Sequence, residues 1–377
     1  MFKKCDLGLS YLNVLCKIFG LSQFSMTTYD KLSPKFRNMI NMTWRWIVTC
    51  IIIAGSIVNI FSLFKLPSFT NFEVVGYILS MPSGYIYCSY DLLAGIFFYQ
   101  RKMRLLLTKI SKIDSCLIRN KQKSVYTTQS NWIIVQIVIM LIILIPFYCL
   151  DHFLSKMEEI WLYWHVHLSR FIREIVNLQL INLVIIVKIR MEFLNKDVMK
   201  CNAFNLRNSS LHLNGPEYFL YIRKMYNELY DVTKIMEEIF GMHILQEITY
   251  DFVNGVCSLY GFVGVLRGRI NHKGSFVYFF YIGGYISWIT LSLGKVLFIS
   301  LSCHSLTKES NKLLQFTYKL LLLNPPRWES LNQLKLLLLQ VSQNKMQLSA
   351  CGAFSVDISI FYKYIASVTM YFIILTQ

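Results

Sequence analysis

Several polar residues lie inside an apolar stretch of about 164–187, where a charge is costly. They are Arg170, Arg173, Glu174, Asn177, Gln179 and Asn182. Ionisable side chains at membrane depth face a wet cavity or pair with one another. Arg170 and Glu174 are four residues apart, so an ion pair along one helix face is as good an interpretation as a ligand cavity. We take both residues as candidates for binding a small molecule.

Aromatic residues in the outer halves of other apolar stretches could form walls of the same cavity. Besides Arg170 and Glu174, the candidates for ligand contact are Tyr85, Tyr87, Tyr148, Trp164, Tyr260, Tyr281, Tyr285 and Trp288. Since 15% of the chain is aromatic, any single one of them is more often a packing residue than a ligand contact.

No pattern in the sequence predicts catalysis or a metal. His165 and His167 are two residues apart, so on a helix they point in different directions, and no third ligand is near them in sequence. We find no Ser/His/Asp order, phosphate-binding loop or paired carboxylates, and the ten cysteines lack C-x-x-C spacing. We therefore expect neither an enzyme nor a cofactor.

The last twenty residues, Ile358 to Gln377, form an apolar stretch that ends in an amide. A helix of this length rises about 30 Å, the thickness of the hydrocarbon core of a bilayer. At helical spacing, Ser367, Met370, Ile374 and Gln377 share one face, which could line a pore. The alternative is that Gln377 lies at the membrane interface or bonds to a neighbouring helix.

Composition predicts an all-α integral membrane protein. The chain is 55% hydrophobic and 16% charged, and soluble proteins are typically about 25% charged. Its net charge of +17 comes from short basic clusters beside apolar runs, which indicates membrane topology and not nucleic-acid binding. We expect membrane lipid to surround the chain.

Seven apolar stretches are long enough to cross a membrane. They lie at about 47–64, 74–99, 132–150, 164–187, 243–266, 276–302 and 358–377. We expect Pro82 and Gly84 to interrupt the second one and open room beside it.

Two longer polar segments separate these stretches, at 188–241 and 303–357. After Gly215 and Pro216 the first predicts a helix that extends the fifth span and carries an apolar seam. The seam consists of Tyr218, Ile222, Met225, Leu229, Val232, Met236 and Ile239. Such a seam packs against other helices, and a helix lying on the membrane surface is the alternative. In the second segment, Asn324-Pro325-Pro326 predicts a helix break.

Lys and Arg are concentrated on one side of the predicted spans. The loops on the other side hold only Lys65, Lys156, Arg267, Arg269 and Lys273. The positive-inside rule therefore predicts a cytosolic N-terminus and an extracellular C-terminus.

Two motifs near the end of the chain resemble those of insect gustatory receptors. Tyr371, five residues and Gln377 are similar to the family's terminal T-Y-x5-Q-F signature, with Met370 in place of its Thr and no final Phe. The segment Ala350 to Asp357 is similar to the Gly-x-Phe-x-x-Asp run that precedes that signature in the family.

This resemblance implies a taste receptor in the plasma membrane of a sensory neuron. It implies a ligand-gated, non-selective cation channel of four identical or related subunits, opened by a small-molecule tastant. By position, Gln377 matches the family's pore glutamine and Ile374 its apolar gate. The family's subunit joint involves the cytosolic ends of its later helices, which would give the seam between Tyr218 and Ile239 a role in assembly.

A G-protein-coupled receptor and a secondary transporter are the alternative seven-span classes. The first requires the opposite orientation, and its Asp/Glu-Arg-Tyr and Asn-Pro-x-x-Tyr motifs are missing from the expected places. The second usually shows internal repeats and broken helices in both halves, which this sequence lacks.

Overall fold

The computed structural model describes residues 12, 14–21, 34–63, 71–117, 131–145, 149, 160–205, 216–267, 275–323 and 328–376. Nearly all of these residues are helical, which confirms the predicted all-α class. The elements in chain order are α2 (Pro34–Leu63), α3 (Asn71–Ala94), the π-helical turn η1 (Gly95–Tyr99), α4 (Gln100–Leu117), α6 (Ile160–Asn205), α7 (Pro216–Leu266), α8 (Ser275–Leu323), α9 (Trp328–Gln343), the strands β1 (Ser349–Ala350) and β2 (Phe354–Ser355), and α10 (Ile358–Thr376). A further apolar helix covers Asn131–Ile145.

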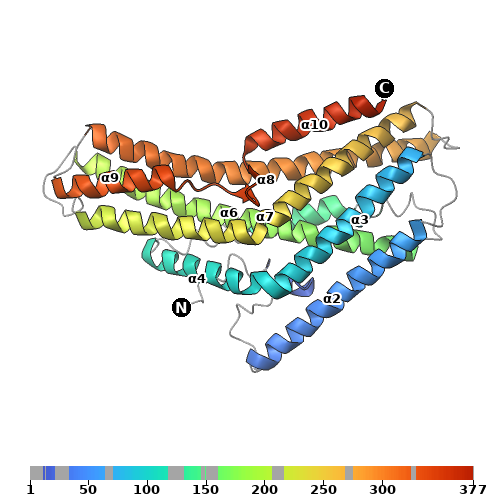
Figure 1. Ribbon diagram of the computed structural model, residues 1–377, viewed down its shortest axis with the longest axis horizontal. Coiled ribbons are helices and arrows are strands. Elements are labelled where there is room, and N and C mark those ends of the chain that lie inside the picture. Colours follow the sequence, from blue (N-terminus) through green and yellow to red (C-terminus); the bar gives the residue numbers. More distant parts are fainter. Residues whose placement is uncertain are drawn as a thin grey trace.

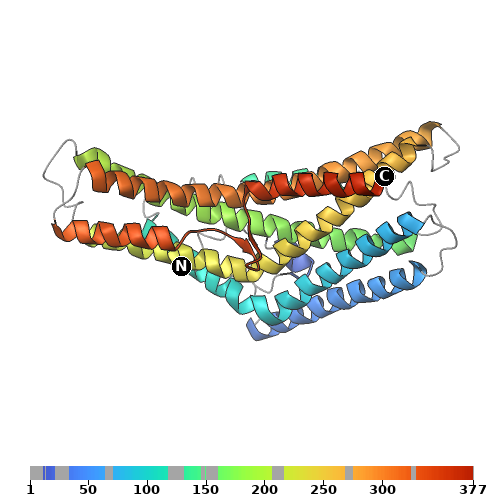
Figure 2. The ribbon, with the colours of Figure 1, turned by 45° about the horizontal axis from the view of Figure 1, so that its top comes forward.

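Three helices run along the whole molecule (Figures 1 and 2). They are α6, α7 and α8, with 46, 51 and 49 residues. At 1.5 Å per residue each is about 70 to 75 Å long, more than twice the thickness of a hydrocarbon core. The extension of α7 is the one that the sequence predicted. The segment 303–357 was expected to be helical with a break at Asn324-Pro325-Pro326, and α8 continues into it as far as Leu323. The continuation of α6 to Asn205 was not predicted. The same three helices, α6, α7 and α8, therefore form both the part with apolar exposed surface and the part beyond it.

Two described helices, at Met39–Val58 and Tyr281–Leu322, are long and apolar enough to cross a membrane by length and composition. The helices at Asn131–Ile145 and Ile358–Ile374 are apolar but shorter. Elsewhere α6 and α7 carry buried charges in their apolar halves, which lowers their mean hydropathy. The count of seven spans stays a prediction.

Large apolar side chains are exposed over α2, the Asn131–Ile145 helix and α10. Examples are Ile57, Phe61, Trp132, Ile142, Met370 and Ile374. An exposed apolar surface of this extent marks contact with lipid or protein. The end of the molecule that includes these helices is therefore the part suited to a bilayer.

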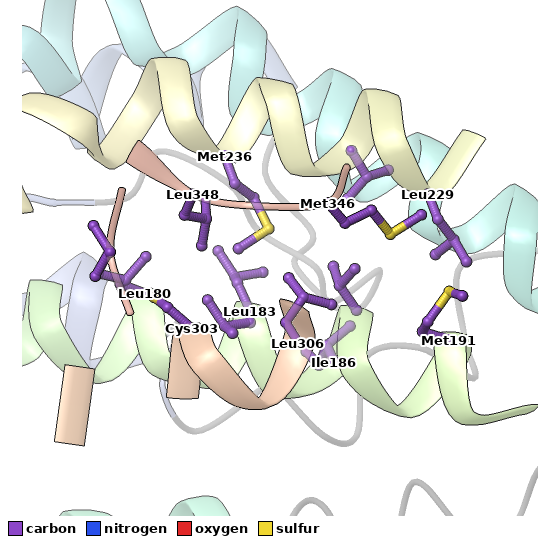
Figure 3. Close-up of a cluster of buried hydrophobic side chains, with 14 of the residues drawn as sticks. Leu180, Leu183, Ile186, Met191, Leu229, Met236, Cys303, Leu306, Met346 and Leu348 are labelled. Atoms are coloured by element: carbon purple, nitrogen blue, oxygen red, sulfur yellow. The ribbon is translucent and has the colours of Figure 1, made fainter. Parts of the chain in front are cut away.

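The largest core lies where α7 faces α6 and α8, and it also includes Ile360, Tyr364 and Val368 of α10. In Figure 3, Met236 points from α7 toward Leu183 of α6, Leu229 points toward Met191 of α6, and Met346 lies beside Leu229. Six of the seven seam residues are buried in this cluster, and Tyr218 packs at its edge. The seam thus packs within its own chain, so the surface-helix alternative is wrong, and a role of this segment in joining subunits stays a prediction.

Charged residues connect α4 to this bundle. Arg190 of α6 donates to both carboxylate oxygens of Asp114, at 2.9 and 3.0 Å, and both side chains are buried. Lys109 and Lys112 bond to Glu228 of α7 at 3.0 and 2.8 Å. Hydrogen bonds from Lys112 and Lys109 hold the pKa of Glu228 below its usual range. These contacts fix α4 against α6 and α7.

The helix α3 continues through Pro82 and Gly84, so neither residue ends it, and the kink expected there stays a prediction. The irregular turn comes later, as η1 between α3 and α4. Room does exist beside Gly84: a Cβ there would lie 3.2 Å from the Tyr250 ring and 3.6 Å from Nη1 of Arg173. Those two side chains use the space that the missing Cβ leaves.

A hairpin leads from α9 to the terminal helix. Ser349 pairs with Ser355 and Ala350 with Phe354, and the turn contains Cys351 and Gly352, with φ of 53° and 75°. The hairpin packs on α7 at Gly241, where a Cβ would come within 3.1 Å of the Cys351 nitrogen. Asp357 then accepts a hydrogen bond of 2.8 Å from the Ser359 amide and caps α10.

Candidate functional site

A small cavity lies among α6, α7, α8 and the Asn131–Ile145 helix, and we call it the Trp288 cavity. Its lining residues are Leu144, Arg170, Arg173, Glu174, Tyr250, Asn254, Trp288, Leu291, Ser292 and Lys295. Its volume of about 10 Å³ is enough for roughly one water molecule. A ligand larger than water therefore requires its walls to move apart.

Three of the predicted ligand residues meet in this cavity. The Arg170 guanidinium lies over the Trp288 ring, 4.2 Å from its centroid. Glu174 pairs with Lys295 of α8, with 3.2 Å between Oε1 and Nζ. Arg170, Arg173 and Glu174 thus line a cavity, while the ion pairs of Arg173 and Glu174 reach other helices. The pairing of Arg170 with Glu174 along α6 stays a prediction.

Three charged residues on α7 and α8 face α6, and the sequence analysis did not name them as candidates. Lys295 lies 2.9 Å from Glu247 and 2.6 Å from Asp251, both on α7. Arg173 donates from Nε to Glu247 at 3.0 Å, pairs with the same carboxylate through Nη2, and stacks on the Tyr250 ring at 3.8 Å. Charges inside apolar spans mark functional sites by default, so Glu247, Asp251 and Lys295 carried a usable signal.

The other predicted ligand residues whose side chains the structure describes do not line the Trp288 cavity. Tyr85 is buried in a separate apolar cluster with Val48 of α2 and Ile172 of α6. Tyr285 lies against Gly261, so closely that a Cβ on the glycine would be 2.5 Å from its ring. Three more are half-buried beyond the lining: Tyr87, Tyr260 and Tyr281. Tyr148 and the side chain of Trp164 lie outside the described residues.

A second cavity of about 60 Å³ lies nearer the middle of the molecule, and we call it the Arg45 cavity. Its lining residues are Leu21, Arg45, Asp91, Gly95, Tyr99, Gln100, Met103, Val176, Gln179, Ile239, Phe240 and His243. Gly95 of η1 makes room for Arg45, since a Cβ there would lie 2.7 Å from Nη2 of the guanidinium. Arg45 is 2% exposed and donates to the Gly20 carbonyl at 2.6 Å. Nothing in the sequence predicted this cavity.

Buried polar groups connect the two cavities. His243 Nδ1 lies 2.7 Å from Asp91 Oδ2, and Nε2 lies 2.9 Å from Asn177 Oδ1. Asn177 Nδ2 lies 3.1 Å from Glu247 Oε1, and Glu247 in turn contacts Lys295 and Arg173 in the Trp288 cavity. A single hydrogen-bonded series thus passes from α3 through α7 and α6 to α8.

The terminal helix packs one face on α7 and α8. Ile360, Tyr364 and Val368 are buried there, and the Tyr364 hydroxyl donates to the Asp251 carbonyl at 2.7 Å. On the predicted pore face, Met370 and Ile374 are 53% and 55% exposed and Ser367 is half-buried. Gln377 lies outside the described residues. Their role in a pore stays a prediction.

Among the residues that the structure describes, no group of three His, Cys, Asp or Glu is placed to hold a metal ion. The charged residues of the two cavities are mostly paired with one another.

We compared the chain with models of protein families and with solved structures. The model of the 7tm chemosensory receptor family matches residues 9–377. Two solved structures of the insect olfactory receptor OR5 from Machilis hrabei, one in complex with eugenol, are similar with TM-scores of 0.64 and 0.63. Each covers 100% of this chain and 99% of its own, at 11% and 10% identity, so the likeness shows the fold alone. No curated protein matches. Since the family match extends over nearly the whole sequence, the chain belongs to the 7tm chemosensory receptor family.

Proposed function

We propose that this chain is a gustatory receptor that opens a non-selective cation pore when a small-molecule tastant enters the Trp288 cavity. It acts as a tetramer, alone or with related chains, in the plasma membrane of a sensory neuron. Membership in the chemosensory receptor family and the motifs that resemble insect gustatory receptors support this proposal.

The observation that carries the proposal is the double contact of Asp251. Its carboxylate lies 2.6 Å from Lys295, which lines the Trp288 cavity, and its backbone carbonyl accepts the Tyr364 hydroxyl of α10 at 2.7 Å. A ligand that displaces Lys295 therefore acts on the residue that holds the terminal helix. Such a ligand favours the open state only by binding it more tightly than the closed one.

The charge of the cavity favours taste over smell. Arg170, Arg173 and Lys295 line it, and Glu174 lies among them. An apolar volatile would gain little there, because these groups would have to lose their polar partners. A polar, water-soluble ligand can replace those partners. OR5 of Machilis hrabei was solved with eugenol, which makes a small organic molecule the class of ligand to test.

Seven spans with a cytosolic N-terminus and an extracellular C-terminus complete the proposal. The excess of Lys and Arg on one side supports this orientation. In it, the long ends of α6, α7 and α8 together with α9 project into the cytosol. The exposed face of α10 with Ile374 lines the pore, and Gln377 lies at its outer end.

Electrical recording from cells that express the chain tests this function. Sugars, bitter compounds, carbon dioxide and volatile phenols are applied in turn. We expect a cation current for one polar class and no response to the phenols. Trp288→Ala, which removes the ring under Arg170, should raise the concentration for half-maximal current about tenfold.

Trp132→Ala is the matched control, because that side chain is 62% exposed on the Asn131–Ile145 helix. It should leave the response unchanged. If a chain that reaches the surface gives no current with any ligand, it is not a channel by itself. Equal effects of the two substitutions would remove the Trp288 cavity from the proposal.

A further inference from the structure

His243 lies between the two cavities and contacts a polar group with each ring nitrogen. Nδ1 is 2.7 Å from Asp91 Oδ2 and Nε2 is 2.9 Å from Asn177 Oδ1. The ring is 3% exposed, so water does not replace these partners.

The partners define how many protons the ring carries. Glu247 faces Arg173 and Lys295, so it is a carboxylate and can only accept. The Asn177 amide therefore donates from Nδ2 to Glu247 and presents its oxygen to His243. Asp91 also accepts. Both ring nitrogens thus face acceptors, an arrangement that fits the doubly protonated imidazolium and not neutral histidine.

Loss of one proton changes the whole series. The remaining N–H stays with the charged Asp91, so Nε2 presents a lone pair to the oxygen of Asn177. The amide then has to rotate to offer a donor, which places its oxygen against the Glu247 carboxylate. Two acceptors repel each other, so Glu247 shifts and its contacts with Arg173 and Lys295 change.

We propose that His243 is a positioning residue for the Trp288 cavity, and that the proton it takes up from the Arg45 cavity sets the affinity for ligand. This inference rests on the proposed function and names the regulation of the same site. In the proposed orientation the Arg45 cavity is the nearer one to the cytosol, so cytosolic protons are the regulator.

Charged groups reach His243 from several elements. Asp91 of α3 and Glu247 of α7 balance the ring charge, whereas Arg173 of α6 opposes it. Arg45 of α2 lines the same cavity with like charge. Lys295 of α8 acts through Glu247. Loss of the proton on His243 therefore changes the charge that side chains of several helices face.

The test is the ligand response of excised inside-out patches at cytosolic pH from about 6 to about 9, a range that a histidine can sense. The ligand is the one that gives the largest current with the wild-type chain, and external pH is held constant. We expect the concentration for half-maximal current to rise about tenfold toward alkaline pH, since one hydrogen bond to a charged group is lost. This measurement needs no substitution, and a flat profile would overturn the inference.

Two variants define the mechanism. His243→Lys keeps a positive charge and can donate to both Asp91 and Asn177. At every pH it should therefore show the ligand affinity that the wild type has at acidic cytosolic pH. His243→Gln is uncharged and can offer its NH2 to Asp91 and its oxygen to Asn177, as neutral histidine offers one donor and one acceptor, so it should show the alkaline affinity at every pH. Surface biotinylation confirms that each variant reaches the membrane. His304→Gln is the control, because that half-buried histidine on α8 lies outside the series, and its profile should match the wild type.

The outcomes separate this inference from the proposed function. A receptor without any ligand-evoked current contradicts the function itself. A normal current whose pH profile survives in both His243 variants contradicts the inference alone. If the variants lower the current equally at all pH values without moving the half-maximal concentration, His243 only stabilises the fold and the positioning role is wrong.

Discussion

Tyr364 is the residue through which the terminal helix contacts the charged series. Gly255 gives it room, since a Cβ there would lie 2.8 Å from the Tyr364 hydroxyl. The hydroxyl donates to the Asp251 carbonyl at 2.7 Å. The next residue of α7, Phe252, packs its ring against that of Tyr371, with 5.5 Å between the ring centroids. Two side chains of α10 therefore hold two adjacent residues of α7.

Tyr364→Phe removes only the hydroxyl. We expect a loss of about 1 kcal/mol in the contact between α10 and α7, the usual net value of one hydrogen bond. Because the ligand cavity then acts on the pore helix less directly, the current at saturating ligand should fall. Tyr362→Phe is the matched control, since Tyr362 is 65% exposed. Equal currents in the two variants would contradict the coupling.

Asp357 provides a pH-dependent contribution at the start of α10. Hydrogen bonds from Ser359, side chain first and backbone second, hold the pKa of Asp357 below its usual range. Its stabilisation is therefore fully present above the unfolded pKa of about 3.9 and is lost as pH falls through the lower folded value.

Asp357→Ala should destabilise the purified receptor by about 1 kcal/mol at neutral pH, as expected for loss of a helix cap. Thermal unfolding in detergent measures this difference. The gap between the variant and the wild type should close as pH falls through the folded pKa of Asp357, because the wild-type carboxylate is then also protonated. A gap that is independent of pH would mean that the carboxylate does not act as a cap. Asp357→Asn should retain most of the stability, because its amide oxygen accepts the same bond.

At the scale of the elements, α7 joins the two parts of the molecule. Its first half carries the seam of the large core. Its second half carries Tyr250, which lines the Trp288 cavity, and Glu247 and Asp251, which pair with Lys295 of that cavity. A continuous helix transmits a displacement along its axis. Packing of the seam therefore affects the receptor even though it contains no ligand contact.

Leu229→Ala tests this packing. Leu229 is 1% exposed in the core, so truncation should cost about 2 to 5 kcal/mol and reduce the amount of folded monomer. Fluorescence-detected size exclusion after a heating series measures the loss. Lys224→Ala, on the exposed face of the same helix, should leave the melting curve unchanged. If Leu229→Ala dissociates tetramers without lowering the melting temperature of the monomer, the seam joins subunits after all.

The sequence predicted local features of these elements better than their partners. Periodicity from Tyr218 to Ile239 identified an apolar seam, because side chains three and four apart share a helix face. Which surface covers the seam depends on contacts with Leu183, Leu306 and Met346, and no local pattern encodes such distant pairs. The same reason explains why Arg170 and Glu174 were identified whereas Lys295 was not.

Neither Pro82 nor Gly84 ends α3. Pro82 has no N–H to donate, which usually ends or bends a helix, yet the helix continues through it. Gly84 admits Tyr250 and Arg173, so this position is specified by packing between helices. The irregular turn at Gly95–Tyr99 instead forms where Arg45 needs space.

At the scale of the whole molecule, the proposed orientation predicts which sequences meet the extracellular solvent. Epitope tags at the two termini should differ, with only the C-terminal tag accessible to antibody on intact cells. The sequons at Asn41 and Asn208 should remain unglycosylated, because the proposed orientation places both on the cytosolic side. Asn208 lies outside the described residues. Glycosidase-sensitive mass that depends on Asn208 would reverse the topology.

Assembly decides what the exposed face of α10 does. On one copy, Met370 and Ile374 are more than half exposed on a helix whose other face is fixed to α7 and α8. If four copies surround an axis, Ile374 forms an apolar ring and Gln377 an amide ring just outside it. Apolar rings close a pore by excluding water, and polar rings influence which ions pass.

The two rings should therefore respond to substitution in different ways. Ile374→Ser should raise the current without ligand, because a hydroxyl ring admits water to the constriction. Ile373→Ser is the matched control: its side chain is 49% exposed but points about 100° away around the helix.

Gln377→Glu should increase the permeability to divalent cations relative to sodium, because it adds negative charge at the outer end of the pore. Reversal potentials in solutions of each ion measure this ratio. If Ile373→Ser leaks as much as Ile374→Ser and Gln377→Glu leaves selectivity unchanged, then α10 faces lipid on this side and another helix lines the pore.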